Sequence, residues 1–599
     1  MKGTKKRLLS MALAACMTLG TAAAFNKANA LEPNVNQGNG FRYSIKDDGT
    51  VSVFYFTMRA EIISIPEKVD GKPVTSVGSF GSTSEAKRIC LPSSIKTIED
   101  GAFQGIEDLS EIVLNNGLES IGRDAFDNCS SLKSIKIPAS VRNIHSYAFH
   151  YSSIENINVD KNNKTYSSID GMLYTKDGSK LLACPGGKKE AVVKQGTKEI
   201  AASAFDLGTQ RVILPHGLQK TSGMKGLDYY AAFVVPSTVK EDTYNMSMYG
   251  YCDTFGEVVK PYNNVFCYKG SPAAKEADKR GYKYIPVDRL NGSNRYMTAA
   301  VISQNLDTNS DTVILASGEG YADALAGVPL ASYKNAPILL TPKNTLSKDT
   351  LAEIDRRKTK EVIILGGEGA VSKNVELELS KRGIKTKRIA GKTRYGTALS
   401  IAQNITSTPQ EIFFTYANDF ADALSASSVA AAKKAPIIYL SKNGDPDKDT
   451  AAYLKSIKGS VKKAYVIGGS GVISDNIMKK ASALLGLKSH ETVERIWGQN
   501  RYETCIAINE RFSSLVTGRS IYVSTGKNYP DALAGGVLAA HNRSAMLLCD
   551  VRLSDSQTNM LKKMHGYTLT AFGGFGAVSD ELFQRVCLAT AEPPRTNLY

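Results

Sequence analysis

The first half of the chain repeats a short apolar pattern every 23 residues. The phenylalanines that mark it are Phe80, Phe103, Phe126 and Phe149. Isoleucines recur at the same interval, five residues before three of them: Ile98, Ile121 and Ile144. A unit made of a short strand, a turn and a second apolar rung cannot bury its own apolar side chains. Neighbouring units must therefore stack, and the pattern predicts a solenoid.

One segment interrupts this period. Residues 165–189, TYSSIDGMLYTKDGSKLLACPGGKK, read as a β-hairpin that turns around Lys176-Asp177-Gly178. A further copy of the repeat follows, with Ile200 and Phe205 at the usual separation. We expect a hairpin inserted into the solenoid.

The second half of the chain alternates two kinds of segment. Short apolar runs such as TVILAS, PILLT and EVIILGG are typical of strands buried on both faces. Between them lie stretches that we expect to be helical, such as YADALAGVPLASYKN, SKDTLAEIDRRK and SKNVELELSKRG. Alternation of strand and helix predicts a parallel α/β sheet.

Four motifs recur three times in constant order, with a period near 100 residues. The first copies are RLNGSNRYMTAAVIS (289–303), RIAGKTRYGTALSIA (388–402) and RIWGQNRYETCIAIN (495–509). An acidic turn follows in ASGEGYADALAG (316–327), TYANDFADALSA (415–426) and STGKNYPDALAG (524–535). Then come the strands APILLT (336–341), APIIYL (435–440) and SAMLLC (544–549). A glycine motif closes each copy: VIILGGEGAVS (362–372), AYVIGGSGVIS (464–474) and LTAFGGFGAVS (569–579).

Every shared motif falls where a strand should turn into a helix. In open α/β sheets ligands bind at this edge, outside the carboxyl ends of the strands. The glycine pairs, each followed by an N-cap serine, leave backbone N–H groups that favour an anion. The alternative is that the glycines serve only the turn. These pairs are Gly366-Gly367 with Ser372, Gly468-Gly469 with Ser474, and Gly573-Gly574 with Ser579.

An arginine marks the predicted start of one helix in each copy: Arg295, Arg394 and Arg501. A cation at this end opposes the helix dipole, so it needs an anionic partner. One candidate is the aspartate of the same copy, which pairs Arg295 with Asp323, Arg394 with Asp422, and Arg501 with Asp531. The other candidate is a phosphate or carboxylate of a bound polymer. We favour the ion pair within the copy.

These motifs resemble the cell wall binding repeat 2 family of Gram-positive surface proteins, over residues 289–585. The resemblance implies a Toprim-like fold with three modules packed as a pseudo-trimer, and it attaches polymer binding to Ile338-Leu339-Leu340. The other copies depart from that step at Ile437-Ile438-Tyr439 and at Met546-Leu547-Leu548. A core strand is the alternative explanation of all three runs. The polymer-binding candidates are Arg295, Tyr296, Asp323, Ile338, Leu339, Leu340, Gly366, Gly367, Arg394, Tyr395, Asp422, Gly468, Gly469, Arg501, Tyr502, Asp531, Leu547, Leu548, Gly573 and Gly574.

The N-terminal pattern resembles the BspA-type surface leucine-rich repeats. The matching segments are LKSIKIPASVRNIHSYAF (132–149) and LESIGRDAFDNCSSL (118–132), and the block at 266–287 resembles the cap that ends such arrays. The predicted domains are a signal peptide (1–30), a leucine-rich-repeat solenoid (41–287) and three α/β modules (288–386, 387–493 and 494–599).

The N-terminal segment and the net charge indicate where the protein is located. A basic start, an apolar stretch and Ala28-Asn29-Ala30 predict a secretory signal peptide cleaved after Ala30. The alternatives are a membrane anchor that is retained and lipidation at Cys16, since Leu13-Ala14-Ala15-Cys16 resembles a lipoprotein box. The formal charge is +16, and five positive charges lie in the first thirty residues, which leaves +11. The remaining chain is basic but lacks the dense Lys/Arg blocks of a nucleic-acid-binding arm. No further long apolar run predicts a membrane span after cleavage.

Enzyme motifs are not found in the sequence. Gly391-Lys392-Thr393 resembles the end of a P-loop, but Thr386 stands where the first glycine is required. Each module offers one recurring aspartate, whereas a Toprim nuclease needs a Glu and a paired Asp set for magnesium. The cysteines are scattered and sit mostly in apolar surroundings, which favours buried free thiols over disulfides or a metal site. A single tryptophan, Trp497, argues against a carbohydrate site built on stacked indoles. We expect no catalysis, cofactor or metal.

The sequence therefore predicts a secreted protein held non-covalently on the cell wall. The three modules would bind an anionic wall polysaccharide or a teichoic-acid-like polymer, and the solenoid would be displayed to bind a protein or glycan. One alternative is a surface-layer component that self-associates. Another is a host-binding adhesin whose wall binding is secondary.

Overall fold

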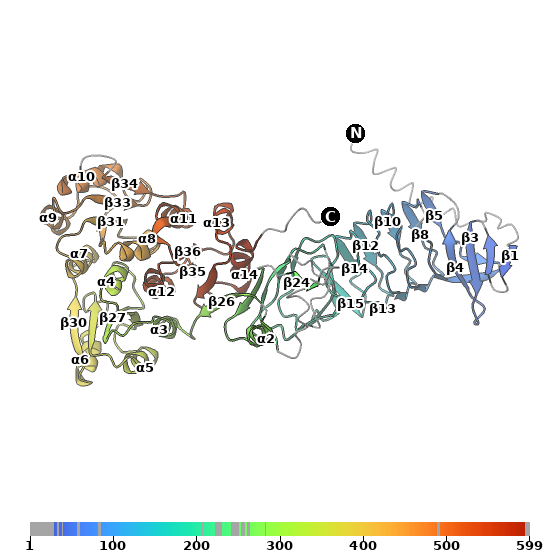
Figure 1. Ribbon diagram of the computed structural model, residues 1–599, viewed down its shortest axis with the longest axis horizontal. Coiled ribbons are helices and arrows are strands. Elements are labelled where there is room, and N and C mark those ends of the chain that lie inside the picture. Colours follow the sequence, from blue (N-terminus) through green and yellow to red (C-terminus); the bar gives the residue numbers. More distant parts are fainter. Residues whose placement is uncertain are drawn as a thin grey trace. The chain divides into compact units, whose positions relative to one another are not determined.

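The computed structural model forms two compact units, which are described separately (Figure 1). The structure describes residues 29–592 except 33–34, 39, 57–59, 82–84, 207, 222–230, 241–250, 253–257, 260–263, 282 and 488–491. Residues 1–28 of the predicted signal peptide lie outside this part, so that prediction is untested. The N-terminal unit ends at Tyr284 and the C-terminal unit is Ile285–Glu592.

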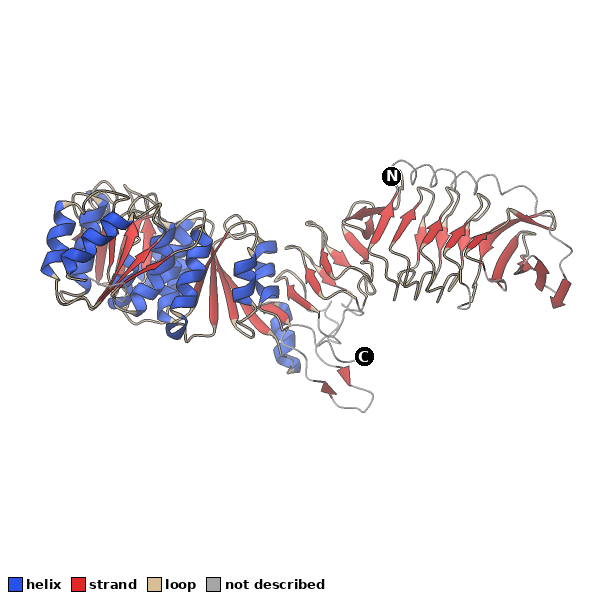
Figure 2. Cartoon of the chain, turned by 90° about the horizontal axis from the view of Figure 1, so that it is seen from above, coloured by secondary structure: helices blue, strands red, loops and turns tan. Residues whose placement is uncertain are grey.

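The N-terminal unit is a solenoid of short parallel strands on an antiparallel start (Figure 2). Its first sheet contains β1 (Asn29–Glu32), β2 (Val35–Gly38), β3 (Phe41–Ile45), β4 (Val51–Phe56), β6 (Lys68–Val69), β7 (Lys72–Val77), β9 (Thr97–Ile98), β11 (Ser120–Ile121) and β13 (Asn143–Ile144). The other rung of each repeat forms β5 (Ile62–Ser64), β8 (Arg88–Cys90), β10 (Glu111–Val113), β12 (Ser134–Ile137) and β14 (Asn156–Val159). The solenoid prediction is confirmed.

Equivalent side chains stack along the solenoid axis, which explains the 23-residue period. Ile121 is paired in register with Ile98 on one side and with Ile144 on the other. The phenylalanines form a buried ladder with ring centroids 5.5 Å apart from Phe80 to Phe103 and from Phe103 to Phe126. Each ring is covered by the rings of its neighbours, so burial requires the next repeat.

The predicted hairpin is present. Strands β16 (Met172–Thr175) and β17 (Lys180–Ala183) pair antiparallel around the expected turn. The Asp177 carboxylate accepts hydrogen bonds from Thr175 and Ser179, and these bonds lower the pKa of Asp177 to about 2. The remaining strands are β15 (Tyr166–Ile169), β18 (Glu190–Val192), β19 (Glu199–Ile200), β20 (Arg211–Ile213), β21 (Lys220–Thr221), β22 (Ala232–Val235), β23 (Tyr251–Cys252), β24 (Val258–Val259) and β25 (Val265–Tyr268), followed by helix α2 (Pro272–Arg280).

The C-terminal unit contains three sets of four neighbouring parallel strands, called sheets 1 to 3, as the strand–helix alternation predicted. Sheet 1 has the order β28 (Ile338–Thr341), β27 (Thr312–Ser317), β29 (Glu361–Leu365), β30 (Lys385–Ile389). Sheet 2 has the order β32 (Ile437–Leu440), β31 (Glu411–Tyr416), β33 (Lys463–Ile467), β34 (Val493–Ile496). Sheet 3 repeats this order with β36 (Ala545–Cys549), β35 (Ser520–Thr525), β37 (Thr568–Phe572) and β26 (Ile285–Leu290).

Sheet 3 is completed by the first strand of the unit. Strand β26 pairs in parallel with β37, and Val287 lies opposite Leu569 although the two are far apart in sequence. In sheets 1 and 2 the equivalent edge strand follows directly in the chain. The start and the end of the C-terminal unit are thereby joined through one sheet.

Three helices rich in small residues form the centre of this unit. Helices α4 (Gly327–Tyr333), α8 (Ala421–Ala432) and α12 (Pro530–His541) each contact the other two. Asp422 and Asp531 of the acidic motifs lie in the first turns of α8 and α12, whereas Asp323 lies just before α4. Around them lie α3 (Arg295–Gln304), α5 (Lys348–Arg356), α6 (Lys373–Lys381), α7 (Arg394–Ile405), α9 (Lys448–Ser456), α10 (Asp475–Leu485), α11 (Arg501–Arg511), α13 (Asp555–Leu561) and α14 (Asp580–Ala589), with a 3-10 turn at Ser513–Leu515.

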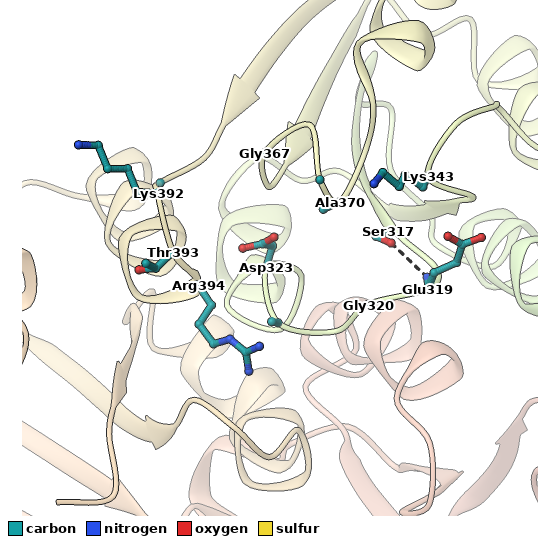
Figure 3. Close-up of a pocket in the computed structure, with 13 residues that line it drawn as sticks. Ser317, Glu319, Gly320, Asp323, Lys343, Gly367, Ala370, Lys392, Thr393 and Arg394 are labelled. Atoms are coloured by element: carbon teal, nitrogen blue, oxygen red, sulfur yellow. Dashed lines mark hydrogen bonds between the residues drawn. The ribbon is translucent and has the colours of Figure 1, made fainter.

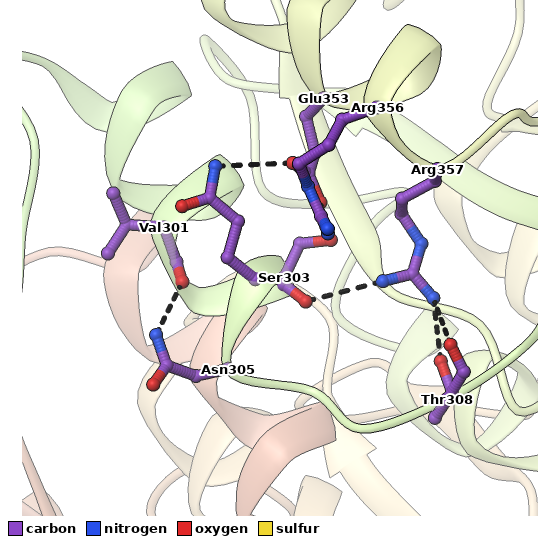
Figure 4. A network of polar contacts seen from close by, with 8 residues as sticks. Val301, Ser303, Asn305, Thr308, Glu353, Arg356 and Arg357 are labelled. Atoms are coloured by element: carbon purple, nitrogen blue, oxygen red, sulfur yellow. Dashed lines mark hydrogen bonds and ion pairs between the residues drawn. The ribbon is translucent and has the colours of Figure 1, made fainter.

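A buried glutamate fastens two of the outer helices together (Figure 4). Glu353 of α5 is 1% exposed and forms two hydrogen bonds with Arg356, at 2.7 and 2.8 Å. Ser303 of α3 donates to the same carboxylate at 2.6 Å. Although burial alone would raise the pKa of Glu353, these hydrogen bonds hold it below its usual value. The network fixes α3, whose first residue is Arg295, against α5.

Six cysteines of the described part are buried: Cys129, Cys184, Cys267, Cys505, Cys549 and Cys587. Cys252 has no described side chain. Within the described residues, no helix has the length and apolar character needed to cross a membrane.

Candidate functional site

The three predicted arginines occupy equivalent positions, each as the first residue of its helix. Arg295 begins α3, Arg394 begins α7 and Arg501 begins α11. The preceding residue caps each helix, because the side chains of Asn294, Thr393 and Asn500 accept hydrogen bonds from backbone N–H groups of the first turn. The cap residues thus accept hydrogen bonds at these helix starts, which the arginines cannot do because a guanidinium only donates.

The expected ion pair within each copy is wrong. Each guanidinium instead donates to a backbone carbonyl in the loop that follows β27, β31 or β35. These bonds join Arg295 to Gly318, Arg394 to Ala417, and Arg501 to Gly526. Arg501 also forms an ion pair with Asp419, which precedes α8, at 3.2 Å. The arginine bridges two copies because its helix packs against the central helix of the preceding copy.

Aromatic rings from the three copies meet beside these arginines. Tyr321, Phe420 and Tyr529 are equivalent residues, and their ring centroids lie 5.8, 5.8 and 6.3 Å apart. Arg394 lies over the ring of Tyr321 at 5.9 Å, and Arg501 over that of Phe420 at 5.2 Å. The arginines thus hold adjacent copies together through cation–π and carbonyl contacts.

The recurring aspartates lie beneath the glycine turns. A Cβ added to Gly366 would stand 2.7 Å from Asp323 Oδ2, and one added to Gly468 would stand 2.5 Å from Asp422 Oδ2. Gly366 and Gly468 also have φ of +95° and +106°, a conformation that favours glycine. The first glycine of each pair therefore serves both the turn and the close approach of the carboxylate.

Burial changes the acidity of two of these aspartates. It raises the pKa of Asp422 to about 6, an effect that the nearby Asp419 increases and Arg501 reduces. Burial likewise raises the pKa of Asp531 to about 6, with Arg295 acting in the opposite direction. Here too the arginine that faces the carboxylate comes from a different copy.

We expect the C-terminal unit to become less stable as the pH rises from about 4 to about 6. A carboxyl group with a raised pKa in the folded state binds its proton more tightly there, so its contribution is complete at low pH and is lost as the pH passes the folded value. Asp422→Asn should remove about 1–3 kcal/mol of this dependence. Urea unfolding across the pH range measures it, with exposed Asp449→Asn as the control. An unchanged pH profile in Asp422→Asn would contradict the assignment.

The carboxyl edge of sheet 1 contains a cavity of about 440 Å³ (Figure 3). Loops after all four strands of the sheet line it, and they supply Asp323, Lys343, Gly367, Lys392 and Arg394. Neither Lys343 nor Lys392 forms an ion pair with another described residue. The cavity is therefore lined by three cationic side chains, those of Lys343, Lys392 and Arg394, and by the carboxylates of Glu319 and Asp323, beside the turn that enters α6.

Several predicted residues lie away from this cavity. Ile338, Leu339 and Leu340 are at most 2% exposed, and Leu547 and Leu548 are fully buried. None of the first three lines the cavity, because helices cover both faces of the strand. The tyrosines after the arginines, Tyr296, Tyr395 and Tyr502, are half-buried and pack against the central core. The runs Ile338-Leu339-Leu340 and Leu547-Leu548 belong to strands of the core.

The family comparison assigns the repeated copies. The model of Cell wall binding domain 2 (CWB2) matches residues 289–376, 388–478 and 495–583. The chain carries three CWB2 modules. The BspA type leucine rich repeat region matches residues 51–169 in six copies. Both resemblances that the sequence suggested are therefore confirmed.

Curated relatives share part of this chain. N-acetylmuramoyl-L-alanine amidase LytC of Bacillus subtilis is 36% identical over 299 residues, which are 49% of this chain and 57% of the relative. The amidase enhancer of the same organism is 34% identical over 260 residues, 43% of this chain and 34% of that protein. The chain thus spans about half or less of the length of these relatives. Among solved structures, Cwp6 from Clostridium difficile is 28% identical with a TM-score of 0.48, covering 51% of this chain and 48% of that one.

The CWB2 modules differ in the residues that surround equivalent edges. The carboxyl edges of sheets 1, 2 and 3 are called edge 1, edge 2 and edge 3. Lys343 at edge 1 corresponds to Lys442 at edge 2 and Val551 at edge 3. Lys392 corresponds to Gln499 and Ser293. Lys343 and Lys392 are not among the residues predicted from the recurring motifs, although each lies within a few residues of one. Aligning the three copies and asking where they differ would have found them.

Proposed function

We propose that the three CWB2 modules hold this protein non-covalently on the cell wall by binding an anionic polysaccharide or a teichoic-acid-like polymer. The observation that carries the proposal is the cavity at edge 1. Its lysines are without ion pairs in the described structure. The glycine turn beside them leads into α6, where the side chain of the N-cap residue Ser372 accepts no hydrogen bond from the first turn. The first N–H groups of a helix have no partner within the helix, and they favour an anion. This combination suits a phosphate or carboxylate group.

Three modules in one body would bind a long polymer more tightly than one. Each module adds weak charge-assisted contacts, and linkage converts the second and third contacts into intramolecular events. The mutual contact of α4, α8 and α12 supports the proposed arrangement of three Toprim-like modules as a pseudo-trimer. The boundaries 288–386, 387–493 and 494–599 are retained as proposed module limits.

The solenoid would be the displayed part of a secreted, non-catalytic surface protein. We propose that it binds a surface-layer or host protein, or a glycan, while the modules bind the wall. Pull-down of ligands with residues 31–287 alone tests this role, and capture by the modules alone would contradict it.

Charge reversal at the edge 1 cavity is expected to weaken wall retention. Lys343→Glu with Lys392→Glu replaces two cations of the cavity with anions, so an anionic polymer should be repelled. We expect at least a fivefold loss in affinity for isolated walls, measured by co-sedimentation. The matched control is Lys334→Glu with Lys358→Glu, which changes the same charge after the ends of α4 and α5, at the opposite edge of the sheet. Equal losses in both variants would show a general charge effect and contradict a specific site.

A further inference from the structure

The only tryptophan of the chain lies at edge 2. Trp497 is the first residue after β34, and its side chain is 54% exposed. The benzene part of the indole lies against Gly469, because a Cβ added there would stand 3.4 Å from Trp497 Cε3 and 3.8 Å from Cδ2. The ring therefore rests on the glycine turn and leaves much of its surface open to solvent.

The other two edges lack this feature. The residues equivalent to Trp497 are Ala390 at edge 1 and Asn291 at edge 3. A Cβ added to Gly367 or to Gly574, the counterparts of Gly469, would meet nothing within 4 Å. Gly367 lines the cavity at edge 1. The indole at edge 2 therefore lies against the glycine that is equivalent to a cavity-lining residue of edge 1.

The groups near the indole in the chain are small and polar. Ser470 follows Gly469 directly, and Gln499 stands two residues after Trp497; both are exposed. A hydroxyl and an amide are suitable partners for sugar hydroxyl groups. An exposed aromatic face beside such groups suits a ligand that is apolar on one face and hydroxylated at its rim.

We infer that Trp497 is a platform on which one sugar ring of the polymer stacks at edge 2, as a single aromatic contact and not as a site built of several indoles. The axial C–H bonds of a pyranose carry partial positive charge and would pack on the negative face of the indole. The inference rests on the proposed wall binding and names the part of the polymer that this edge takes. An apolar protein surface would need a wider exposed patch than one indole.

The uniqueness of Trp497 makes a direct test possible. Its fluorescence in the full-length protein reports on edge 2 alone, when excitation is chosen so that tyrosine does not absorb. The probes are wall polysaccharide with its phosphate intact, the same polysaccharide after removal of phosphate, and inorganic phosphate. We expect both polysaccharides to shift the emission and to protect the indole from acrylamide quenching, and inorganic phosphate to leave both signals unchanged.

Variants separate stacking from structure. Trp497→Ala should weaken binding of the dephosphorylated polysaccharide about fivefold to tenfold, in line with stacking of planar rings on aromatic side chains. Trp497→Phe should recover most of the loss. Tyr333→Ala is the matched control, since Tyr333 is 51% exposed at the end of α4, away from the carboxyl edges. Unchanged thermal unfolding of all three variants shows that the fold is intact.

The outcomes distinguish the two proposals. If the protein binds walls but the emission, the quenching and the affinity of Trp497→Ala are all unchanged, the stacking role is refuted and the wall-binding function stands. If inorganic phosphate alone reproduces the spectral shift, edge 2 is an anion site and the inference is wrong. If the full-length protein binds neither walls nor polysaccharide, the proposed function and the inference fail together.

Discussion

Phe126→Ala is expected to lower the free energy of unfolding of the N-terminal unit by about 4 kcal/mol. The ring is fully buried and stacks between Phe103, with centroids 5.5 Å apart, and Phe149, at 5.8 Å. Its removal leaves a cavity inside a ladder whose neighbouring rungs cannot collapse without breaking the strand register. Because contacts in a solenoid run from one repeat to the next, the loss should uncouple the repeats on either side.

Guanidinium unfolding followed by circular dichroism measures this effect on the full-length protein. Ile62→Ala removes apolar side-chain atoms from the same solenoid at a site that is 60% exposed, and it should change stability by less than about 0.5 kcal/mol. The transition of the C-terminal unit serves as an internal reference and should not move. A loss below about 1 kcal/mol for Phe126→Ala would contradict the role assigned to the ladder.

Gly468→Ala should lower the unfolding free energy of the C-terminal unit by about 3 kcal/mol. Two costs add: an L-residue at φ +106° is strained, and the new Cβ would stand 2.5 Å from Asp422 Oδ2 and 2.6 Å from Val472 Cγ2. Neither neighbour can move freely, since Asp422 is buried at the start of a central helix and Val472 belongs to the turn itself.

Gly471→Ala is the matched control in the same loop. A Cβ there would meet nothing within 4 Å, and its φ is not positive, so we expect a change of less than about 0.5 kcal/mol. Urea unfolding of both variants gives the comparison. Equal stabilities would show that the turn tolerates a side chain and would remove the structural reason for the glycine motif.

The local structure was predictable from the sequence wherever a fixed spacing of apolar residues reflected a contact between neighbouring repeats. The phenylalanine ladder and the paired isoleucines are stacks of equivalent residues, so a fixed spacing in the chain becomes a fixed position in the solenoid. Strands and helix starts of the modules were also predictable, because unbroken apolar runs and cap residues are local signals.

Contacts between copies were not predictable in the same way. The pairing of β26 with β37 joins segments from opposite ends of the C-terminal unit, and nothing in the composition of either strand indicates its partner. The arginine partners were misassigned for the same reason. Arg501 reaches Asp419 of another copy only because α11 packs on α8, a tertiary fact that spacing does not encode.

The candidate site was predicted in its position but only partly in its residues. The carboxyl edge follows from the order of strand and helix, and Asp323, Gly367 and Arg394 do line the cavity there. Lys343 recurs in only one other copy and Lys392 in neither, so a search for residues shared by all three copies does not find them.

Co-sedimentation of the full-length protein with isolated walls, before and after the anionic polymer is removed, tests the central claim most directly. We predict retention by intact walls that weakens with moderate salt, and loss of most retention by stripped walls. Equal retention by stripped walls, unaffected by salt, would show that the modules do not hold the protein through the negative charge of the polymer.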